Sequence, residues 1–270
     1  MMTEWKVLAQ GALDAVKAAR AEILTIMKRV YEVQYKNDRS PVTEADMASQ
    51  AVLIEKLHQV DPSIPVVSEE LKTIDYDTRL TWPRLWMVDP LDGTKEFVRG
   101  NGEFTINVAL IENHQAVIGV IDWPVGDITY MAIKNEGAYR LEKTGSIRLH
   151  SHSFSNPANV VISRSHRQSE IDWVRRSQIA IRSIDYVGSA LKFCRIAEGR
   201  DDVYPRLTPN MEWDSAAGHI LVAEAGGQVV DFLGHPLQYN KPDLHNEGFV
   251  AVGDWAAWRE YFVRQGTFSK

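Results

Sequence analysis

The segment spanning residues 104–141 constrains the fold more than any other part of the chain. It holds four β-rich stretches, separated by residues 112–114, 124–127 and 135–137, all of which have turn compositions. Strands joined by such short turns pair with their sequence neighbours in opposite directions. The sequence therefore predicts an antiparallel β meander in the first half of the chain.

Two helices are predicted before the meander. Apolar residues from Trp5 to Met27 recur at spacings of three and four, which is typical of an amphipathic helix. A second helix is expected to start near Thr43, because Pro41 precedes it and Asp46 follows three residues later, as in a capping box. Asp46 thus lies in the first turn of a helix.

Two short apolar runs carry acidic residues to their ends. Residues 64–67 run into Ser68, Glu69 and Glu70, and residues 85–88 run into Asp89. Runs of this length, bounded by polar residues, are typical of buried strands. We expect Glu69 and Asp89 at the ends of two such strands.

The second half of the chain alternates strand and helix patterns. The predicted strands are residues 160–163, 182–187, 228–231 and 249–252, and the predicted helices are residues 169–180, 189–198, 213–225 and the segment from residue 254 onward. No internal repeat or flexible linker separates the halves. The pattern predicts an α+β protein in which residues 1–155, with most candidate metal ligands, and residues 156–270 pack as one unit.

Composition excludes several classes of protein. The net charge of −6 argues against a surface that collects nucleic acid, although a local basic pocket stays open. The single cysteine, Cys194, excludes an internal disulfide framework and a cysteine-rich zinc site, and its apolar neighbours predict a buried helix position. We expect neither a signal peptide nor a transmembrane helix, and a cytoplasmic location. Peripheral contact with the cytoplasmic face of the inner membrane stays open.

The segment Asp89-Pro90-Leu91-Asp92-Gly93-Thr94 is the candidate functional centre. A buried strand leads directly into two acids three residues apart, Pro90 stiffens the link, and Gly93 permits a tight turn. Magnesium prefers oxygen ligands such as these. Taken alone, the segment fits an ordinary turn equally well. The metal site is favoured by three further acids, Glu69, Asp46 and Asp214. Asp214 is expected to open the helix after Trp213. Acids that open helices, however, are often only caps.

Four motifs, in their order along the chain, resemble those of the inositol monophosphatase superfamily of lithium-sensitive, magnesium-dependent phosphatases. The motifs are Thr43-Glu44-Ala45-Asp46, Ser68-Glu69-Glu70, Asp89 to Thr94, and Trp213-Asp214-Ser215-Ala216-Ala217 with Glu224-Ala225-Gly226-Gly227. The resemblance covers nearly the whole chain. It implies a layered α/β/α/β/α sandwich, in which an antiparallel sheet and a second, mixed sheet meet with the acids between them.

The resemblance also implies roles for individual residues. Glu69, Asp89 and the carbonyl of Leu91 would hold one metal ion, whereas Asp89, Asp92 and Asp214 would hold a second. A third, weaker ion would lie near Asp46, so that two or three Mg²⁺ ions are expected. Thr94, assisted by Asp46, would orient and activate the nucleophilic water. Substrate phosphate would lie against the same ligands and against Gly93 and Thr94.

Further motifs resemble the bisphosphate nucleotidase branch of the superfamily. They are Lys95-Glu96-Phe97, Ser163-Arg164-Ser165-His166, Gly188 to Cys194, and Tyr204-Pro205-Arg206. Ser189, Lys192 and Arg206 would then contact the second phosphate or the ribose of a nucleotide, and His166 would lie near the base. The alternative is that Lys192 and Arg206 are solvated surface charges, as most such residues are.

The expected reaction is removal of the 3′-phosphate of adenosine 3′,5′-bisphosphate to give AMP and phosphate, as the resemblance implies for sulfur assimilation. The sulfated nucleotide 3′-phosphoadenylyl sulfate is a second expected substrate. Two alternatives remain: an inositol or sugar-phosphate phosphatase with the same metals, and a regulatory member of the superfamily that contacts RNA machinery. The sequence leaves open lithium sensitivity, the preference between 3′,5′- and 2′,5′-bisphosphates, and the choice between monomer and homodimer.

Overall fold

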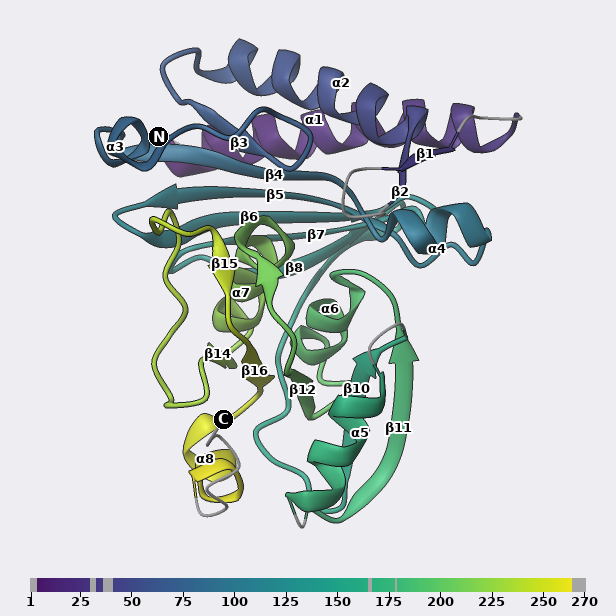
Figure 1. The fold of residues 1–270 in the computed structure, drawn as a ribbon, viewed down its shortest axis with the longest axis vertical. Coiled ribbons are helices and arrows are strands. Elements are labelled where there is room, and N and C mark those ends of the chain that lie inside the picture. Colours follow the sequence, from purple (N-terminus) through teal and green to yellow (C-terminus); the bar gives the residue numbers. More distant parts are fainter. Residues whose placement is uncertain (1–3, 30–32, 36–40, 165–166, 178, 264–270) are drawn as a thin grey trace.

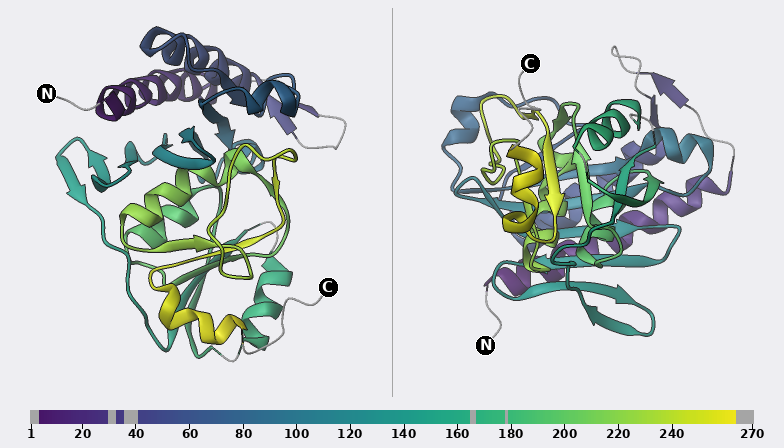
Figure 2. Two further views of the ribbon diagram at one scale, coloured as in Figure 1. Left: turned by 90° about the vertical axis from the view of Figure 1, so that its left-hand side faces the viewer. Right: turned by 90° about the horizontal axis from the view of Figure 1, so that it is seen from below.

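The computed structural model describes residues 4–29, 33–35, 41–164, 167–177 and 179–263. The two large sheets alternate in layers with groups of helices (Figures 1 and 2). A helix pair covers the outer face of the first sheet, two helices lie between the sheets, and two more cover the outer face of the second sheet. The chain thus has the predicted α/β/α/β/α arrangement.

The first sheet is seven-stranded, in the order β3-β4-β5-β6-β7-β8-β9. Its strands are β3 (Val66–Ser68), β4 (Arg84–Asp92), β5 (Thr105–Glu112), β6 (Gln115–Trp123), β7 (Ile128–Ile133), β8 (Gly137–Glu142) and β9 (Gly145–Arg148). The predicted meander corresponds to β5 through β8 and is confirmed. The expectation of an antiparallel sheet is wrong at one edge, where β3 pairs parallel to β4. A parallel pair needs a long crossover, and residues 69–83 supply it.

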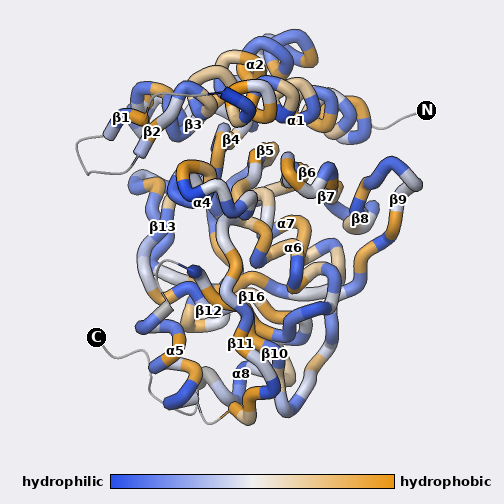
Figure 3. The backbone as a smooth tube through the Cα atoms, turned by 90° about the vertical axis from the view of Figure 1, so that its right-hand side faces the viewer, coloured by the Kyte–Doolittle hydropathy of each residue, from blue (hydrophilic) through white to orange (hydrophobic). Residues whose placement is uncertain are grey.

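Helices α1 (Glu4–Met27) and α2 (Glu44–Val60) cover one face of this sheet. Figure 3 shows hydrophobic and hydrophilic residues alternating along both helices, which is the pattern that predicted the first of them. The capping box is confirmed, since Ala45 N donates to Thr43 Oγ1 at 3.1 Å and Thr43 N donates to Asp46 Oδ2 at 2.7 Å. It fixes the start of α2 and buries Asp46.

The second sheet is five-stranded and mixed, in the order β11-β10-β12-β16-β14. Its strands are β10 (Ala158–Ser163), β11 (Ile181–Val187), β12 (Val203–Arg206), β14 (Gln228–Val230) and β16 (Phe249–Val252). Helices α6 (Leu191–Ala197) and α7 (Ala216–Glu224) lie between the sheets, and α5 (Arg167–Arg176) and α8 (Trp255–Val263) lie outside. Helix α5 ends four residues before the predicted end at residue 180.

The remaining elements are short. They are β1 (Val33–Tyr35), β2 (Pro41–Thr43), α3 (Tyr76–Leu80), α4 (Thr94–Arg99), β13 (Asn210–Met211), the 3₁₀ turn η1 (Glu212–Asp214) and β15 (His245–Asn246). Helix α7 therefore starts two residues after Asp214, so the expectation that Asp214 opens the α-helix is wrong. In the 3₁₀ turn Ser215 N donates to Glu212 O, and Met211 N donates to Asp214 Oδ2, each at 3.1 Å.

One apolar core joins the two halves. It runs from Met87 and Ile121 of the first sheet, through Phe193 and Leu221 of the inner helices, to Ala251 of the second sheet. Cys194 is buried on α6 within this core, as predicted. The boundary at residue 155 stays a prediction. No helix within the described residues is both long and apolar enough to cross a bilayer.

Candidate active site between the two sheets

Strand β4 is longer than predicted and contains the acidic residues of the candidate centre. It extends through Asp92 rather than ending at Val88, and its pairing with β5 shifts register between Asp89 and Asp92. Leu91 N donates to Asp89 Oδ1 at 3.0 Å, and Ser49 Oγ donates to Pro90 O at 2.7 Å. The extra residues make the strand bulge. Asp89 and Asp92 therefore lie within a bulged strand, although the bond from Leu91 N to Asp89 Oδ1 is the side-chain contact of an Asx turn.

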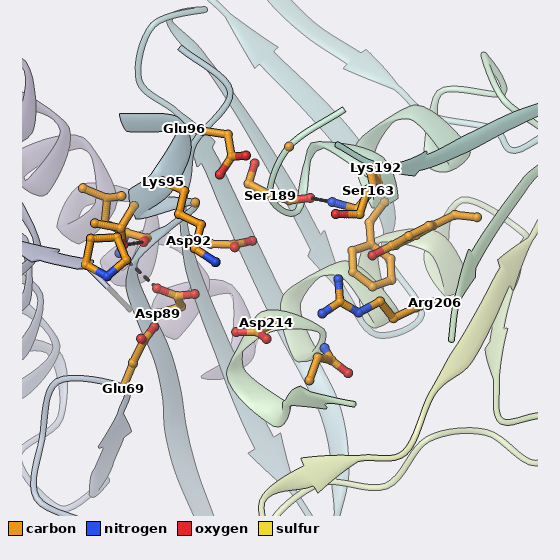
Figure 4. Close-up of a pocket in the computed structure, with 18 residues that line it drawn as sticks. Glu69, Asp89, Asp92, Lys95, Glu96, Ser163, Ser189, Lys192, Arg206 and Asp214 are labelled. Atoms are coloured by element: carbon orange, nitrogen blue, oxygen red, sulfur yellow. Dashed lines mark hydrogen bonds between the residues drawn. The ribbon is translucent and has the colours of Figure 1, made fainter. Parts of the chain in front are cut away.

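Three carboxylates converge beside this bulge. One oxygen from each of Glu69, Asp89 and Asp214 lies within 4.8 Å of the other two. Asp89 is 1% exposed, and the other two side chains are half-buried. Glu69 follows β3, and Asp214 comes from the 3₁₀ turn in the second half of the chain (Figure 4). The structure thus brings together acids that are far apart in the sequence.

Asp92 lines the same cavity but does not belong to this close group. Asn107 Nδ2 donates to Asp92 Oδ2 at 3.3 Å. In Figure 4 the Asp92 carboxylate points away from Glu69, toward the side of the cavity where Lys192 lies. Asp92 therefore connects the acidic group to the opposite wall.

The carboxylates repel one another in a buried setting. Burial, followed by the charges of Asp92 and Glu69, raises the pKa of Asp214 to about 8. Burial raises the pKa of Asp92 to about 6, against the opposing charge of Lys192. The pKa of Asp89 is raised well above its usual value, first by burial and then by Glu69. Such a cluster needs added positive charge to stay ionised at neutral pH.

A threonine and an aspartate flank the cluster. Thr94 Oγ1 donates to Asp46 Oδ1 at 3.0 Å, with a longer contact of 3.4 Å to Leu91 O. The other Asp46 oxygen accepts hydrogen bonds from the Thr43 amide and hydroxyl, each at 2.7 Å. Because its proton is directed to Asp46, the Thr94 oxygen keeps its lone pairs for an incoming donor. The predicted pairing of Thr94 with Asp46 is present.

Cationic side chains form the opposite wall. Lys192 is only 4% exposed, so the alternative that it is a solvated surface charge is wrong. Its Nζ donates to Ser189 O at 2.5 Å and lies 5.3 Å from the centre of the Tyr204 ring. Arg206 lines the same cavity and donates through Nε to Thr208 O at 3.1 Å. Burial lowers the pKa of Lys192 to about 8, against the charge of Asp92.

The cavity between these walls has a volume of about 280 Å³. Every predicted site residue except Asp46 and His166 lines it; Asp46 lies behind Thr94, and His166 falls outside the described residues. Eight lining residues were not predicted as site residues: Pro41, Lys95, Glu96, Ser163, Gly188, Phe193, Tyr204 and Asn210. All of them except Pro41 and Asn210 lie within the motifs that resemble the nucleotidase branch, so those motifs carried a signal for them. Asn210 had no such signal.

The donor set fits a divalent cation with a preference for oxygen. Glu69, Asp89, Asp92 and Asp214 offer carboxylates, and Leu91 offers a carbonyl at the same bend. No sulfur ligand lines the cavity, and none of the histidines in the described part of the chain does so. Oxygen-only ligation suits magnesium, calcium or manganese better than zinc or copper.

A comparison over the whole chain identifies its family. Residues 4–264 match the model of the inositol monophosphatase family, so the chain belongs to that family, whose members are metal-dependent. Curated relatives named 3′(2′),5′-bisphosphate nucleotidase CysQ are 43% identical in two bacteria. The Shigella flexneri protein aligns over 219 residues, 81% of this chain and 87% of its own length. The Salmonella typhimurium protein aligns over 245 residues, 90% of this chain and 95% of its own.

A solved structure agrees as well. The crystal structure of CysQ from Bacteroides thetaiotaomicron, a bacterial member of the inositol monophosphatase family, is 38% identical, with a TM-score of 0.78. It covers 91% of this chain and 97% of the Bacteroides chain. The layered fold and the family resemblance seen in the sequence are both confirmed.

Proposed function

We propose that this protein is a magnesium-dependent 3′(2′),5′-bisphosphate nucleotidase. It removes the 3′-phosphate of adenosine 3′,5′-bisphosphate to give AMP and phosphate, and accepts 3′-phosphoadenylyl sulfate as a second substrate. One observation carries the proposal: a single cavity holds a carboxylate cluster on one wall and the buried Lys192 with Arg206 on the other. The names and the 43% identity of the curated relatives support it.

The acidic wall would receive the phosphate that is cleaved. Glu69, Asp89 and Leu91 would hold one Mg²⁺, and Asp89, Asp92 and Asp214 would hold a second; a third ion near Asp46 is also proposed. When bound, these ions neutralise the phosphate dianion and lower the pKa of a coordinated water. The protein's part is to fix the ligands, and the bulge between Asp89 and Asp92 does so.

Thr94 and Asp46 would position the nucleophilic water. The Thr94 hydroxyl donates to Asp46 and can accept a hydrogen bond from water, which turns a lone pair of that water toward the phosphorus. Asp46 cannot rotate away, because three donors hold its two oxygens. The amides of Gly93 and Thr94, at the same bend, would bind phosphate oxygens.

The cationic wall would bind the second phosphate. Burial lowers the pKa of Lys192 to about 8 although the charge of Asp92 opposes this shift, so a further anion beside Lys192 would favour its charged form. A phosphate dianion placed between Lys192 and Arg206 would be such an anion. Ser189 would add a hydroxyl donor to the same group.

The cationic wall favours a nucleotidase over the alternative of an inositol or sugar-phosphate phosphatase. An inositol monophosphate carries one phosphate, so binding it at the carboxylates would leave Lys192 and Arg206 without an anion. The regulatory alternative is disfavoured because all the proposed metal ligands and Thr94 line one cavity, with Asp46 bound to Thr94 behind it. A location in the cytoplasm, the peripheral membrane contact, lithium sensitivity and the choice between monomer and homodimer stay predictions of the sequence.

A substrate panel tests the proposal. With Mg²⁺, we expect phosphate release from adenosine 3′,5′-bisphosphate to exceed release from inositol 1-phosphate by more than about tenfold in kcat/KM. The reason is that only the nucleotide uses both walls of the cavity. The measurement is inorganic phosphate released under matched conditions. The opposite order would rule out the nucleotidase assignment while leaving a metal-dependent phosphatase.

Magnesium should stabilise the protein more at high pH than at low pH. The raised pKa values of Asp214, about 8, and Asp92, about 6, mean that the folded protein holds protons on these groups that the unfolded chain has released. Without metal, their contribution to stability is therefore lost as pH rises from about 4 through these values. Metal binding requires the deprotonated carboxylates.

The measurement is the thermal midpoint with and without Mg²⁺. We expect the increase on adding Mg²⁺ to be larger at pH 8 than at pH 5.5 by about 5 °C or more. The control is the thermal midpoint of the metal-free protein, measured in buffer with a chelator at both pH values. An equal increase at both values would contradict a carboxylate-bound metal.

A further inference from the structure

An ion pair crosses between the two sheets beside the cavity. Glu103 lies in the loop between α4 and β5, and Arg164 follows β10 directly. Arg164 Nε donates to Glu103 Oε2 at 2.9 Å, and Arg164 Nη2 donates to Glu103 Oε1 at 2.6 Å. Both side chains are partly exposed, at 24% for Glu103 and 38% for Arg164. Two parallel hydrogen bonds fix the relative orientation of the partners, which a single charge contact would not do.

The same pair holds the backbone that leads to the cationic wall. Gly188 N donates to Glu103 Oε2 at 2.9 Å, and Arg164 Nη2 donates to Tyr186 O at 2.5 Å. The backbone is thus bound on both sides of Val187. Ser189, the next residue, has a positive φ of 51°, and its carbonyl accepts the hydrogen bond from Lys192. Moving this turn would move Ser189 and Lys192 together.

The main chain of Glu103 also separates the two phosphate-binding turns. A Cβ atom added to Gly188 would lie 2.6 Å from Glu103 O, and one added to Gly93 would lie 3.2 Å from the same oxygen. Both turns therefore pack directly against Glu103. Gly93 follows Asp92 on the acidic wall, and Gly188 precedes Ser189 on the cationic wall. Glu103 lies between the two walls as a spacer.

This spacer is itself anchored to the first sheet. Glu103 N donates to Asn101 Oδ1 at 3.0 Å, and Trp123 Nε1 on β6 donates to Gly102 O at 2.8 Å. Phe104, the next residue, is fully buried. These contacts fix the position of the loop relative to the first sheet. They therefore also fix the position of the Glu103 carboxylate that binds Arg164.

We propose that Glu103 and Arg164 are positioning residues that set the distance between the carboxylate cluster and the pocket for the second phosphate. In this way they select a bisphosphate over a monophosphate. The inference rests on the proposed function. It adds that this ion pair fixes the separation between the sites for the two phosphates. Neither residue lines the cavity, so both act through Gly188, Ser189 and Lys192.

The test compares two substrates that differ only in the second phosphate. For Glu103→Gln, which keeps the shape of the side chain and removes its charge, kcat/KM is measured on adenosine 3′,5′-bisphosphate and on adenosine 3′-monophosphate. We expect the ratio of the two values to fall about tenfold, chiefly through a higher KM for the bisphosphate. Arg164→Lys, which keeps the charge but loses the paired hydrogen bonds, should lower the ratio in the same direction.

A matched control lies on the two elements that flank the turn at Gly188. Asp185→Asn removes the ion pair between Asp185 on β11 and Arg195 on α6, without touching the turn at Gly188. Its substrate ratio should stay within about twofold of the wild type. Thermal midpoints are measured for all variants. If Glu103→Gln does not fold, Arg164→Lys decides alone.

The outcomes separate this inference from the proposed function. A wild-type preference for the bisphosphate that survives both Glu103→Gln and Arg164→Lys would overturn the inference alone. Equal losses on both substrates would also overturn it, because they indicate a purely structural role. A wild-type enzyme without any preference for the bisphosphate would overturn the proposed function and the inference together.

Discussion

Asp89→Asn is expected to lower kcat by about a thousandfold or more with Mg²⁺ present, because it removes a negative charge from the residue that we propose as a ligand of both metal ions. The substitution changes no heavy-atom count, and Asp89 Oδ1 only accepts a hydrogen bond from Leu91 N. The measurement is the steady-state kcat on adenosine 3′,5′-bisphosphate over a range of Mg²⁺ concentrations. Near-normal turnover would contradict the metal site.

Stability should respond differently from activity. The buried carboxylates repel one another, so neutralising Asp89 is expected to leave the chelator-treated protein at least as stable as the wild type. The matched control is Asp202→Asn, since Asp202 is also 1% exposed but has its partners, Asn159 N and His152 Nδ1, outside the cavity. Its kcat should stay within about threefold of the wild type, which separates loss of a metal ligand from loss of a buried charge.

Thr94→Val is expected to lower kcat by about a hundredfold with little change in KM, because it removes the hydroxyl that would orient the water while keeping the side-chain shape. The matched variant is Thr94→Ser, which keeps the hydroxyl and its hydrogen bond to Asp46. Thr94→Ser should retain activity to within about tenfold of the wild type.

The readout is kcat and KM for both Thr94 variants on the same substrate. If Thr94→Val and Thr94→Ser were equally active, the hydroxyl would have no part in positioning the water. If both were equally inactive, the methyl group and its packing would matter instead of the hydroxyl. Only the contrast between the two variants supports the proposed role.

Local patterns predicted most of the elements. The first helix was recognised from the spacing of its apolar residues, and the start of α2 from the capping box formed by Thr43 and Asp46. Both are short-range features, in which neighbouring residues determine the backbone conformation. The meander was recognised for the same reason, since its turns lie within a few residues of each strand.

Elements that depend on distant partners were missed or displaced. Strand β12 (Val203–Arg206) contains Pro205 and becomes a strand because it pairs with β10 and β16. The extension of β4 to Asp92 is set by its pairing with β5 on the far side of a bulge. Neither partner is adjacent in the sequence. A local pattern cannot show which strand will supply the hydrogen bonds.

The site shows the same division. The motifs named nearly every residue that lines the cavity, but they did not show that Asp92 lies apart from the close group of Glu69, Asp89 and Asp214. That arrangement depends on how η1 approaches β4. The pairing of Glu103 with Arg164 was not predicted either, because it joins loops 61 residues apart and has no spacing pattern of its own.

The buried state of Lys192 was the most informative result for substrate choice. From the sequence, Lys192 was open to two interpretations, a phosphate ligand or a solvated surface charge. Its 4% exposure and its place in the cavity wall remove the second. Lys192 already faces Asp92, so its burial alone does not identify the substrate, but it places a fixed positive charge beside Arg206, on the wall where we propose that the second phosphate binds.

The identity of the product tests the central claim most directly. Wild-type protein is incubated with adenosine 3′,5′-bisphosphate and Mg²⁺, and the nucleotide products are separated and counted against released phosphate. The account predicts adenosine 5′-monophosphate and one phosphate per substrate, with the reaction abolished by a chelator. Release of the 5′-phosphate instead, leaving adenosine 3′-monophosphate, or turnover that persists without metal, would contradict it.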